Sequence, residues 1–380
     1  MSSLYLHIPF CQQKCPYCDF FSRQGSRRDI AEYVELLLIH LSLFHENNPD
    51  HISPLKTIFF GGGTPSLLTG DQLEKILLKI AALFSLDDCV EITLEANPGT
   101  VTTGLFERYR RAGVNRLSFG VQSLSHRNLR TLGRIHTAEE AALSIESART
   151  AGFDNISLDL MFGLPDQSSA ALEKEVTGLL EFCPEHISLY GLSFEEGTDF
   201  YRRLHEGTLS ACEEDLYVEQ YELIHDILEN SGFDHYEISN FARPGRECVH
   251  NQNYWRRKTS LGLGAGAHSF NESGWGERWH VPADIEGYRS ELQGGRDPLE
   301  LLEQYNHAGA MSETAYLALR TKAGLDPNRF RKKFNRSFTE TFAKALKKTE
   351  PYLEIDDPTG CYRLNLSGWL IYDHLISHFL

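Results

Sequence analysis

Short β-branched and aromatic runs alternate with longer amphipathic segments through the first half of this 380-residue chain. Six runs have the character of strands: residues 4–8, 56–60, 90–96, 115–120, 155–163 and 186–192. Helical segments lie between them, over residues 29–47, 71–84, 103–112, 138–151 and 169–182. A repeated order of strand then helix predicts a parallel sheet covered by helices, and right-handed crossovers curl such a sheet. Six units, rather than eight, predict an α/β fold with an incomplete (β/α)6 barrel.

The second half predicts another kind of structure. One amphipathic helix covers residues 213–231, and residues 236–283 read as an irregular region rich in Gly, Asn and Trp. Helical segments follow at 305–322, 327–334 and 339–349, then a hairpin around Pro358 and a last helix from Ser367. Two domains are expected at this length. We therefore predict a core domain (1–235), a connecting region (236–283) and a mainly helical C-terminal domain resembling a winged helix (284–380).

Composition and charge argue against two kinds of partner. A net charge of −16 opposes binding to a nucleic-acid backbone, which needs a basic face. No run of 18 apolar residues is present, so no membrane-spanning helix is expected. The N-terminus lacks the basic and apolar regions of a secretory signal. We therefore expect a soluble cytoplasmic protein whose cysteines stay reduced.

Three cysteines near the N-terminus, Cys11, Cys15 and Cys18, have a C-x3-C-x2-C spacing. Iron–sulfur clusters are normally held by four thiolates, so a local set of three predicts a cluster with one iron open to a further ligand. Chance burial, a zinc site and disulfides are the alternatives. Zinc would need a fourth ligand, for which His7 is a weak candidate, and disulfides need an oxidising compartment. The other cysteines show no ligand spacing: Cys89, Cys183, Cys212, Cys248 and Cys361.

Glycine and polar residues stand at the carboxyl ends of the predicted strands, where function gathers in barrels of this kind. The run GGGTP at 61–65 follows one strand, and its glycines allow a ligand to approach the backbone closely. Glu95, Gln122 and Asp159 occupy three later strands. A single buried acid is often only a hydrogen-bonded structural group. Three polar residues at the same end of three successive strands are harder to dismiss, because burying charges there is costly without a ligand or partner, which favours a binding site.

The cysteine spacing, with Tyr17 before the third cysteine, resembles the radical S-adenosylmethionine superfamily. The motifs LYLHIPFC, FFGGGTPS, LEANPGT, RLSFGVQSL, LGRIH, DLMFGLP and GLGAGAHS extend the resemblance over nearly the whole chain. The resemblance implies a [4Fe–4S] cluster on the three cysteines, with S-adenosylmethionine chelating the open iron through its amino and carboxylate groups. It also implies the residues that line that cofactor: Tyr5, Tyr17, Gly63, Thr64, Pro65, Glu95, Gln122, Arg134, Asp159 and Ser193.

Within the superfamily, these motifs resemble the group that contains the oxygen-independent coproporphyrinogen III oxidase HemN and the haem chaperone family HemW. The oxidase has a long N-terminal extension and a fourth cysteine where this chain has Phe20; both differences favour the chaperone branch. Residues 250–255, HNQNYW, resemble a chaperone motif whose histidine is implicated in haem binding. The resemblance implies that His250 ligates haem, with Tyr254 and Trp255 offering apolar faces to the porphyrin. A structural histidine and a Cys248 thiolate ligand are the alternatives.

The resemblance therefore predicts a haem chaperone that binds a [4Fe–4S] cluster, S-adenosylmethionine and haem, and passes haem to acceptor proteins. One alternative is an enzyme that decarboxylates coproporphyrinogen III, or another radical enzyme acting on a tetrapyrrole. A redox sensor that uses the cluster without turnover is a third. No catalytic residue is assigned.

Overall fold

A computed structural model describes residues 3–48 and 54–380. Six parallel strands form the centre of its sheet, each pairing with the next along the chain. They are β1 (Ser3–Ile8), β4 (Thr57–Gly62), β5 (Glu91–Ala96), β6 (Arg116–Gln122), β7 (Ile156–Phe162) and β8 (His186–Gly191). These are the six predicted strands. The predicted fold class, an α/β partial barrel, is confirmed.

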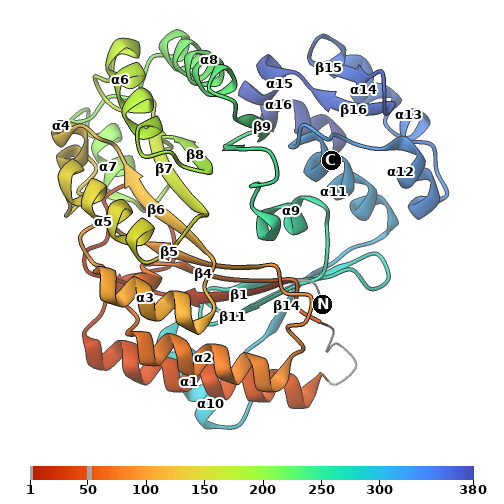
Figure 1. The fold of residues 1–380 in the computed structure, drawn as a ribbon. Coiled ribbons are helices and arrows are strands. Elements are labelled where there is room, and N and C mark those ends of the chain that lie inside the picture. Colours follow the sequence, from red (N-terminus) through yellow and green to blue (C-terminus); the bar gives the residue numbers. More distant parts are fainter. Residues whose placement is uncertain (1–2, 49–53) are drawn as a thin grey trace.

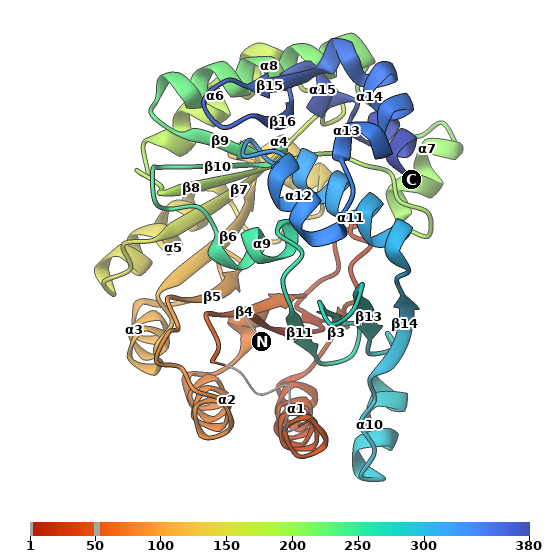
Figure 2. The ribbon, with the colours of Figure 1, turned by 90° about the vertical axis from the view of Figure 1, so that its right-hand side faces the viewer.

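Helices cover the outer side of the curved sheet (Figures 1 and 2). They are α1 (Arg27–Asn47), α2 (Gly70–Leu83), α3 (Thr103–Ala112), α5 (Ala138–Thr150), α6 (Ser169–Leu180) and α8 (Glu214–Asn230). Ser26, Thr69 and Thr137 begin three of them with capping boxes, which satisfy backbone N–H groups that have no partner inside the helix. The sequence did not predict α4 (His126–Thr131) or α7 (Asp199–His205), which are too short to show helical periodicity.

The segment 236–283, expected to be irregular, instead extends the sheet at both edges. On one side, β9 (Asp234–Glu237) and β10 (Asn240–Ala242) continue the sheet beyond β8. On the other, β11 (Ser260–Leu263) pairs in parallel with β1 and leads to three antiparallel strands. These are β12 (His268–Asn271), β13 (Glu277–His280) and β14 (Glu300–Gln304). Within the described residues the result is one sheet of twelve strands.

The helix α9 (Val249–Trp255), which carries the HNQNYW motif, lies inside the curve of the sheet (Figure 1). Glu91, the first residue of β5, accepts hydrogen bonds from the backbone N–H groups of Val249 (2.9 Å) and His250 (3.0 Å). Thr57, the first residue of β4, contacts the His250 ring. A buried carboxylate stabilises a helix N-terminus because the first N–H groups have no intrahelical acceptor. These contacts hold α9 at the amino ends of the strands.

The C-terminal residues form a second core. The helix α10 (Ile285–Gln293) packs beside α1, and the mainly helical part follows. It comprises α11 (His307–Leu319), α12 (Pro327–Phe334), α13 (Phe338–Thr341), α14 (Ala343–Thr349), α15 (Leu366–Leu370), α16 (Tyr372–Ile376) and the hairpin β15 (Leu353–Asp356) with β16 (Cys361–Leu364). Two predicted helices are interrupted, at Phe342 and Ile371. No helix in the described part of the chain has both the length and the apolar character to cross a membrane.

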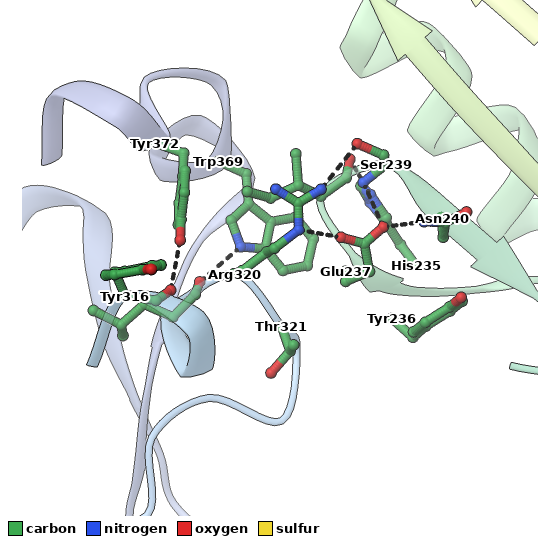
Figure 3. A network of polar contacts seen from close by, with 12 residues as sticks. His235, Tyr236, Glu237, Ser239, Asn240, Tyr316, Arg320, Thr321, Trp369 and Tyr372 are labelled. Carbon is green, nitrogen blue, oxygen red and sulfur yellow. Dashed lines mark hydrogen bonds and ion pairs between the residues drawn. The ribbon is translucent and has the colours of Figure 1, made fainter. Parts of the chain in front are cut away.

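A polar network joins this helical part to the sheet edge (Figure 3). Arg320 donates to the fully buried carboxylate of Glu237 at 2.7 Å and to the Ser239 hydroxyl at 3.4 Å. The backbone of Glu237 also forms an antiparallel bridge with Thr321. Since a buried carboxylate needs a charged partner, this pair ties the C-terminal helices to β9.

Candidate functional site

The cysteine loop begins at β2 (Phe10–Cys11) and ends at β3 (Arg23–Gln24), and these two short strands pair with each other. Cys11, Cys15 and Cys18 are all partly exposed. Burial raises the pKa of the Cys18 thiol. Within residues 3–48 and 54–380, no three His, Cys, Asp or Glu side chains converge on a point where one metal ion could bind. Because each thiolate of a four-iron cluster binds its own iron, cluster ligands do not need such convergence.

The glycine run after β4 packs directly against the cysteine loop. The backbone N–H of Gly63 donates to the Ile8 carbonyl (2.9 Å), and that of Thr64 donates to the Phe10 carbonyl (2.8 Å). A Cβ atom on Gly63 would lie 2.6 Å from the Phe10 carbonyl oxygen. Pro65 begins a short 3-10 helix, Pro65–Leu67. The close contact between the glycine run and the cysteine loop therefore requires glycine at position 63. The sequence analysis had given only the approach of a ligand as the reason for these glycines.

Arg134 connects the cysteine loop to the ends of β5 and β6. Its guanidinium donates to the Asn97 side-chain oxygen and to the Gly120 carbonyl, both at 2.7 Å, and lies 3.5 Å from the Cys15 sulfur. Asn97 in turn donates to the Thr64 hydroxyl at 3.0 Å. The sequence analysis missed Asn97, although it lies in the quoted LEANPGT motif. These residues bring the cysteine, glycine and LGRIH motifs together.

Gln122 and Arg134 each have one buried polar atom without a protein partner. The side-chain oxygen of Gln122 and the Nε of Arg134 are buried and have no hydrogen bond to any described residue. Gln122 also has a backbone φ of 66°, in the left-handed region that non-glycine residues rarely adopt. Buried polar atoms are normally satisfied, and strained residues cluster at binding sites. Both observations fit a polar ligand here.

A cavity of about 710 Å³ lies inside the curve of the sheet. It is lined by four predicted site residues, Tyr5, Glu95, Asp159 and His250, and reaches Phe20 in the cysteine loop. The cavity therefore extends from α9 at the amino ends of the strands to the cysteine loop at their carboxyl ends. Its volume is within the range of small-molecule and cofactor sites, roughly 300–1,000 Å³.

Two carboxyl groups in this cavity have raised pKa values. Burial, and then the nearby Asp159, raise the pKa of Glu95 to about 8. Burial raises the pKa of Asp159 to about 6, against the effect of hydrogen bonds from Ser188 and Ser118 and of the Arg116 charge. The Nε of Arg116 is also buried with no described partner. Buried carboxyl and guanidinium groups such as these suit a ligand that carries both a positive charge and polar groups.

His250 is buried, and both of its ring nitrogens are hydrogen-bonded. Nδ1 lies 2.8 Å from the Thr57 hydroxyl, and Nε2 lies 2.8 Å from the Tyr254 hydroxyl. Burial lowers the pKa of His250 to about 3. Ligation of iron by His250 would therefore require the loss of one of these bonds. Trp255 lines the cavity and is partly exposed, with the Arg320 guanidinium 4.4 Å from its ring centroid.

Gly63, Thr64, Pro65, Gln122 and Arg134 do not line the cavity, and neither do Cys248, the alternative haem ligand, or the predicted contacts Tyr17 and Ser193. The buried thiol of Cys248 faces Glu91 at 3.5 Å, and burial raises its pKa to about 12, which disfavours a thiolate ligand. Tyr17, within the cysteine loop, packs on Phe200. Ser193 is exposed. Conversely, the cavity wall contains His7, which the sequence analysis considered only as a weak zinc ligand, and residues that it did not assign to a site: Arg116, His186, Tyr190, His268 and His280.

Comparisons with known proteins agree with this architecture. A radical SAM superfamily model matches residues 5–176, and a HemN C-terminal domain model matches residues 305–371. The fold is similar to that of coproporphyrinogen III oxidase (HemN) from Escherichia coli, with a TM-score of 0.84 over 99% of this chain and 89% of that one, at 22% identity.

Sequence relatives define the family more closely. The haem chaperone HemW of Escherichia coli is 43% identical over 70% of this chain and 69% of its own length. HemW of Lactococcus lactis is 36% identical over 91% of this chain and 88% of its own. HemW of Bacillus subtilis is 35% identical over 100% of this chain and 99% of its own. Because that similarity runs along both chains almost completely, this chain belongs to the HemW family of the radical SAM superfamily.

Proposed function

We propose that this protein is a haem chaperone, which binds a [4Fe–4S] cluster, S-adenosylmethionine and haem and passes haem to acceptor proteins. The observation that carries the proposal is the 710 Å³ cavity that joins the cysteine loop to the HNQNYW helix. The names of the sequence relatives, which are haem chaperones, support the same role.

Cys11, Cys15 and Cys18 would hold the cluster, because three thiolates leave one iron open to S-adenosylmethionine. When bound, the cluster supplies an electron for radical chemistry on that cofactor. Arg134, fixed beside Cys15, would offset part of the negative charge of the thiolates. The partial exposure of all three cysteines fits a cluster that is assembled on the folded chain.

S-adenosylmethionine carries an ammonium and a sulfonium, and the cavity offers carboxyl groups to both. Glu95 and Asp159 would favour these cations, while Tyr5 lines the same wall. Gln122, with its unpaired oxygen, would accept a hydrogen bond from the ribose or adenine. Thr64 and Pro65 lie beside the cysteine loop, where the methionyl end would bind. Tyr17 and Ser193 remain predicted contacts outside the cavity lining.

Each of the three predicted regions would have its own role in binding the cofactors and haem. Residues 1–235 would bind the cluster and S-adenosylmethionine, and 236–283 would supply α9 and the strands that complete the cavity. Residues 284–380 would cover the cavity and dock acceptor proteins. Leu317 of α11 already contributes to the cavity lining, which supports a covering role.

The cluster ligands are tested first. Replacement of Cys11, Cys15 or Cys18 with Ala should abolish the four-iron cluster after anaerobic reconstitution. The matched variants at Cys89, Cys183 and Cys361 should reconstitute normally. Iron and sulfide analysis decides the outcome, and full occupancy in a Cys15→Ala protein would exclude this ligand set.

The function itself is tested by incubating the reconstituted protein with haem and a reductant, then adding an apo-haem protein. A chaperone should transfer haem without altering the tetrapyrrole, as judged by mass spectrometry, which also detects any deoxyadenosine. Chromatography after incubation with coproporphyrinogen III tests the alternative enzyme. Decarboxylated product from the wild type would favour the oxidase. The Phe20→Cys variant should remain without oxidase activity, because a single added thiol supplies no substrate contacts.

A further inference from the structure

Two histidines face the main cavity from the antiparallel hairpin β12–β13. His268 begins β12 and His280 ends β13, and the two residues are directly paired across the strands. Their ring centroids are 5.8 Å apart, and both side chains line the cavity. The sequence analysis quoted His268 only as part of the GLGAGAHS motif. These histidines lie on the part of the cavity wall formed by the strands beyond β11.

The cavity histidines differ in whether a ring nitrogen is free. His186 bonds Ser157 and Tyr236, both at 2.8 Å, and His7 bonds Tyr5 at 3.0 Å and the Phe21 carbonyl at 2.8 Å. Both nitrogens of His250 are occupied in the same way. The exposed ring of His268 makes no hydrogen bond to any residue that the structure describes. An axial haem ligand needs a neutral imidazole with one free nitrogen, a condition that His268 meets.

The surroundings of His268 suit a porphyrin. Alternate residues of a strand face the same side, so His268 and Phe270 share a face of β12, opposite His280 and Arg278 of β13. All four line the cavity, as do Phe20 of the cysteine loop and Lys258. Phe20 is 64% exposed, which leaves an aromatic face free beside the hairpin. Phe20 would pack on the porphyrin plane. Arg278 already pairs with Glu313, and Lys258 already pairs with Glu272, so the propionates would compete with these two carboxylates for the cations.

We infer that haem binds against the β12–β13 hairpin with His268 as an axial iron ligand. His250 is then a structural residue that holds α9 at the amino ends of the strands. His280, at 3.7 Å from Glu300, is the neighbouring imidazole able to take over ligation when His268 is removed. This inference rests on the proposed haem binding and changes the ligand that the sequence motif implied.

The test is haem titration of the full-length, cluster-reconstituted protein, followed by absorption and electron paramagnetic resonance spectroscopy. His268→Ala with His280→Ala should shift the Soret band and weaken haem binding by at least about tenfold. In the His280→Ala background, the His268→Met variant should give a distinct spectrum from thioether ligation. In the same background, free imidazole should restore the wild-type spectrum to His268→Gly. His250→Gln, which retains polar atoms for Thr57 and Tyr254, should keep the wild-type Soret position.

The pair His374 and His378 is a matched control, since its rings are 5.3 Å apart but line no described cavity. Ala variants there should leave the haem spectrum unchanged. Iron, sulfide and S-adenosylmethionine binding should be normal in every variant, which separates ligand loss from misfolding. Unaltered haem spectra and affinity in the His268/His280 double variant would overturn the inference. A shifted Soret band in His250→Gln alone, with normal cluster content, would do the same. Absence of haem binding by the wild type would instead overturn the proposed function.

Discussion

Arg134 places a guanidinium nitrogen 3.5 Å from the sulfur of Cys15, a residue 119 positions earlier in the chain. Hydrogen bonds to Asn97 and Gly120 fix that guanidinium, so its charge cannot swing away from the loop. Hydrogen bonds to sulfur and nearby charge are two of the factors that set the potential of an iron–sulfur cluster. Arg134 is therefore a positioning residue for the site as well as a predicted cofactor contact.

We predict that Arg134→Gln assembles a cluster with a more negative midpoint potential, because a positive charge that favours the reduced state is lost. A redox titration followed by electron paramagnetic resonance measures the shift. The control is Arg130→Gln, which changes an exposed arginine on α4, four residues before Arg134, and should leave the potential unchanged. Equal potentials in the wild type and Arg134→Gln would show that the guanidinium does not act on the cluster.

The raised pKa of Glu95 predicts a pH dependence of stability. Between the unfolded pKa, near 4.5, and the folded pKa, about 8, the folded chain holds this proton more tightly than the unfolded chain. Stability without ligand therefore falls as pH rises through this window. Glu95→Gln removes this pH dependence. The free energy of unfolding of the variant, relative to that of the wild type, should therefore rise by on the order of 1 kcal/mol or more between pH 5 and pH 9.

Denaturant unfolding at several pH values measures this difference, with the exposed Glu107→Gln as the control. The same ionisation has the opposite effect on ligand binding. A cationic ligand binds the ionised carboxylate better, so S-adenosylmethionine should bind the wild type more tightly as pH rises toward 8. A parallel pH profile in Glu95→Gln would place the cation away from this carboxylate.

The Arg320–Glu237 pair predicts strong coupling between the C-terminal helices and the sheet edge. Arg320→Met should destabilise the protein by about 3–5 kcal/mol, because it leaves the buried Glu237 carboxylate without its charged partner. The exposed Lys75–Glu35 pair is the control, and Lys75→Met should cost only about 0–1 kcal/mol. Adding Glu237→Gln to Arg320→Met should recover part of the loss. Similar losses for the buried and exposed pairs would contradict this interpretation.

The contact between Gly63 and Phe10 predicts that a substitution at Gly63 disturbs both the proposed cluster site and the proposed S-adenosylmethionine site. A methyl group on Gly63 would meet the Phe10 backbone oxygen at 2.6 Å and nitrogen at 2.8 Å. Gly63→Ala should therefore cost about 1–3 kcal/mol and reduce both cluster content and S-adenosylmethionine binding. Gly104→Ala is the control, since a Cβ there has no neighbour within 4 Å. Full cluster content with loss of S-adenosylmethionine binding alone would show that Gly63 acts through the cofactor.

The sequence predicted the central barrel because its six parallel strands are buried on both faces and read as continuous apolar runs. It did not predict the strands between 234 and 280. Those strands have only three or four residues, too few for a period to appear, and they exist because neighbouring strands pair with them.

The site shows the same difference between features that follow from local sequence patterns and features that depend on contacts between distant segments. Tyr5, Glu95 and Asp159 line one cavity, because parallel topology brings successive strands together; their contact with a cofactor stays a prediction. The links from Arg134 to Asn97 and Cys15 join distant segments, so no local pattern contains them. The hydrogen bonds that occupy both nitrogens of His250 were equally hidden. A motif identifies a histidine, but only the folded chain determines whether its lone pair is free.

The hydrogen bonds from Gly63 and Thr64 to the backbone before Cys11 make the two loops one mechanical unit. Whatever orders one loop would also order the other, so the proposed cluster and S-adenosylmethionine would share a coupling free energy. That coupling would be reciprocal: the factor by which the cluster tightens S-adenosylmethionine would be the factor by which S-adenosylmethionine tightens the cluster. A chelator should accordingly strip iron more slowly when the cofactor is bound, and the cell's supply of S-adenosylmethionine would set how long each cluster survives.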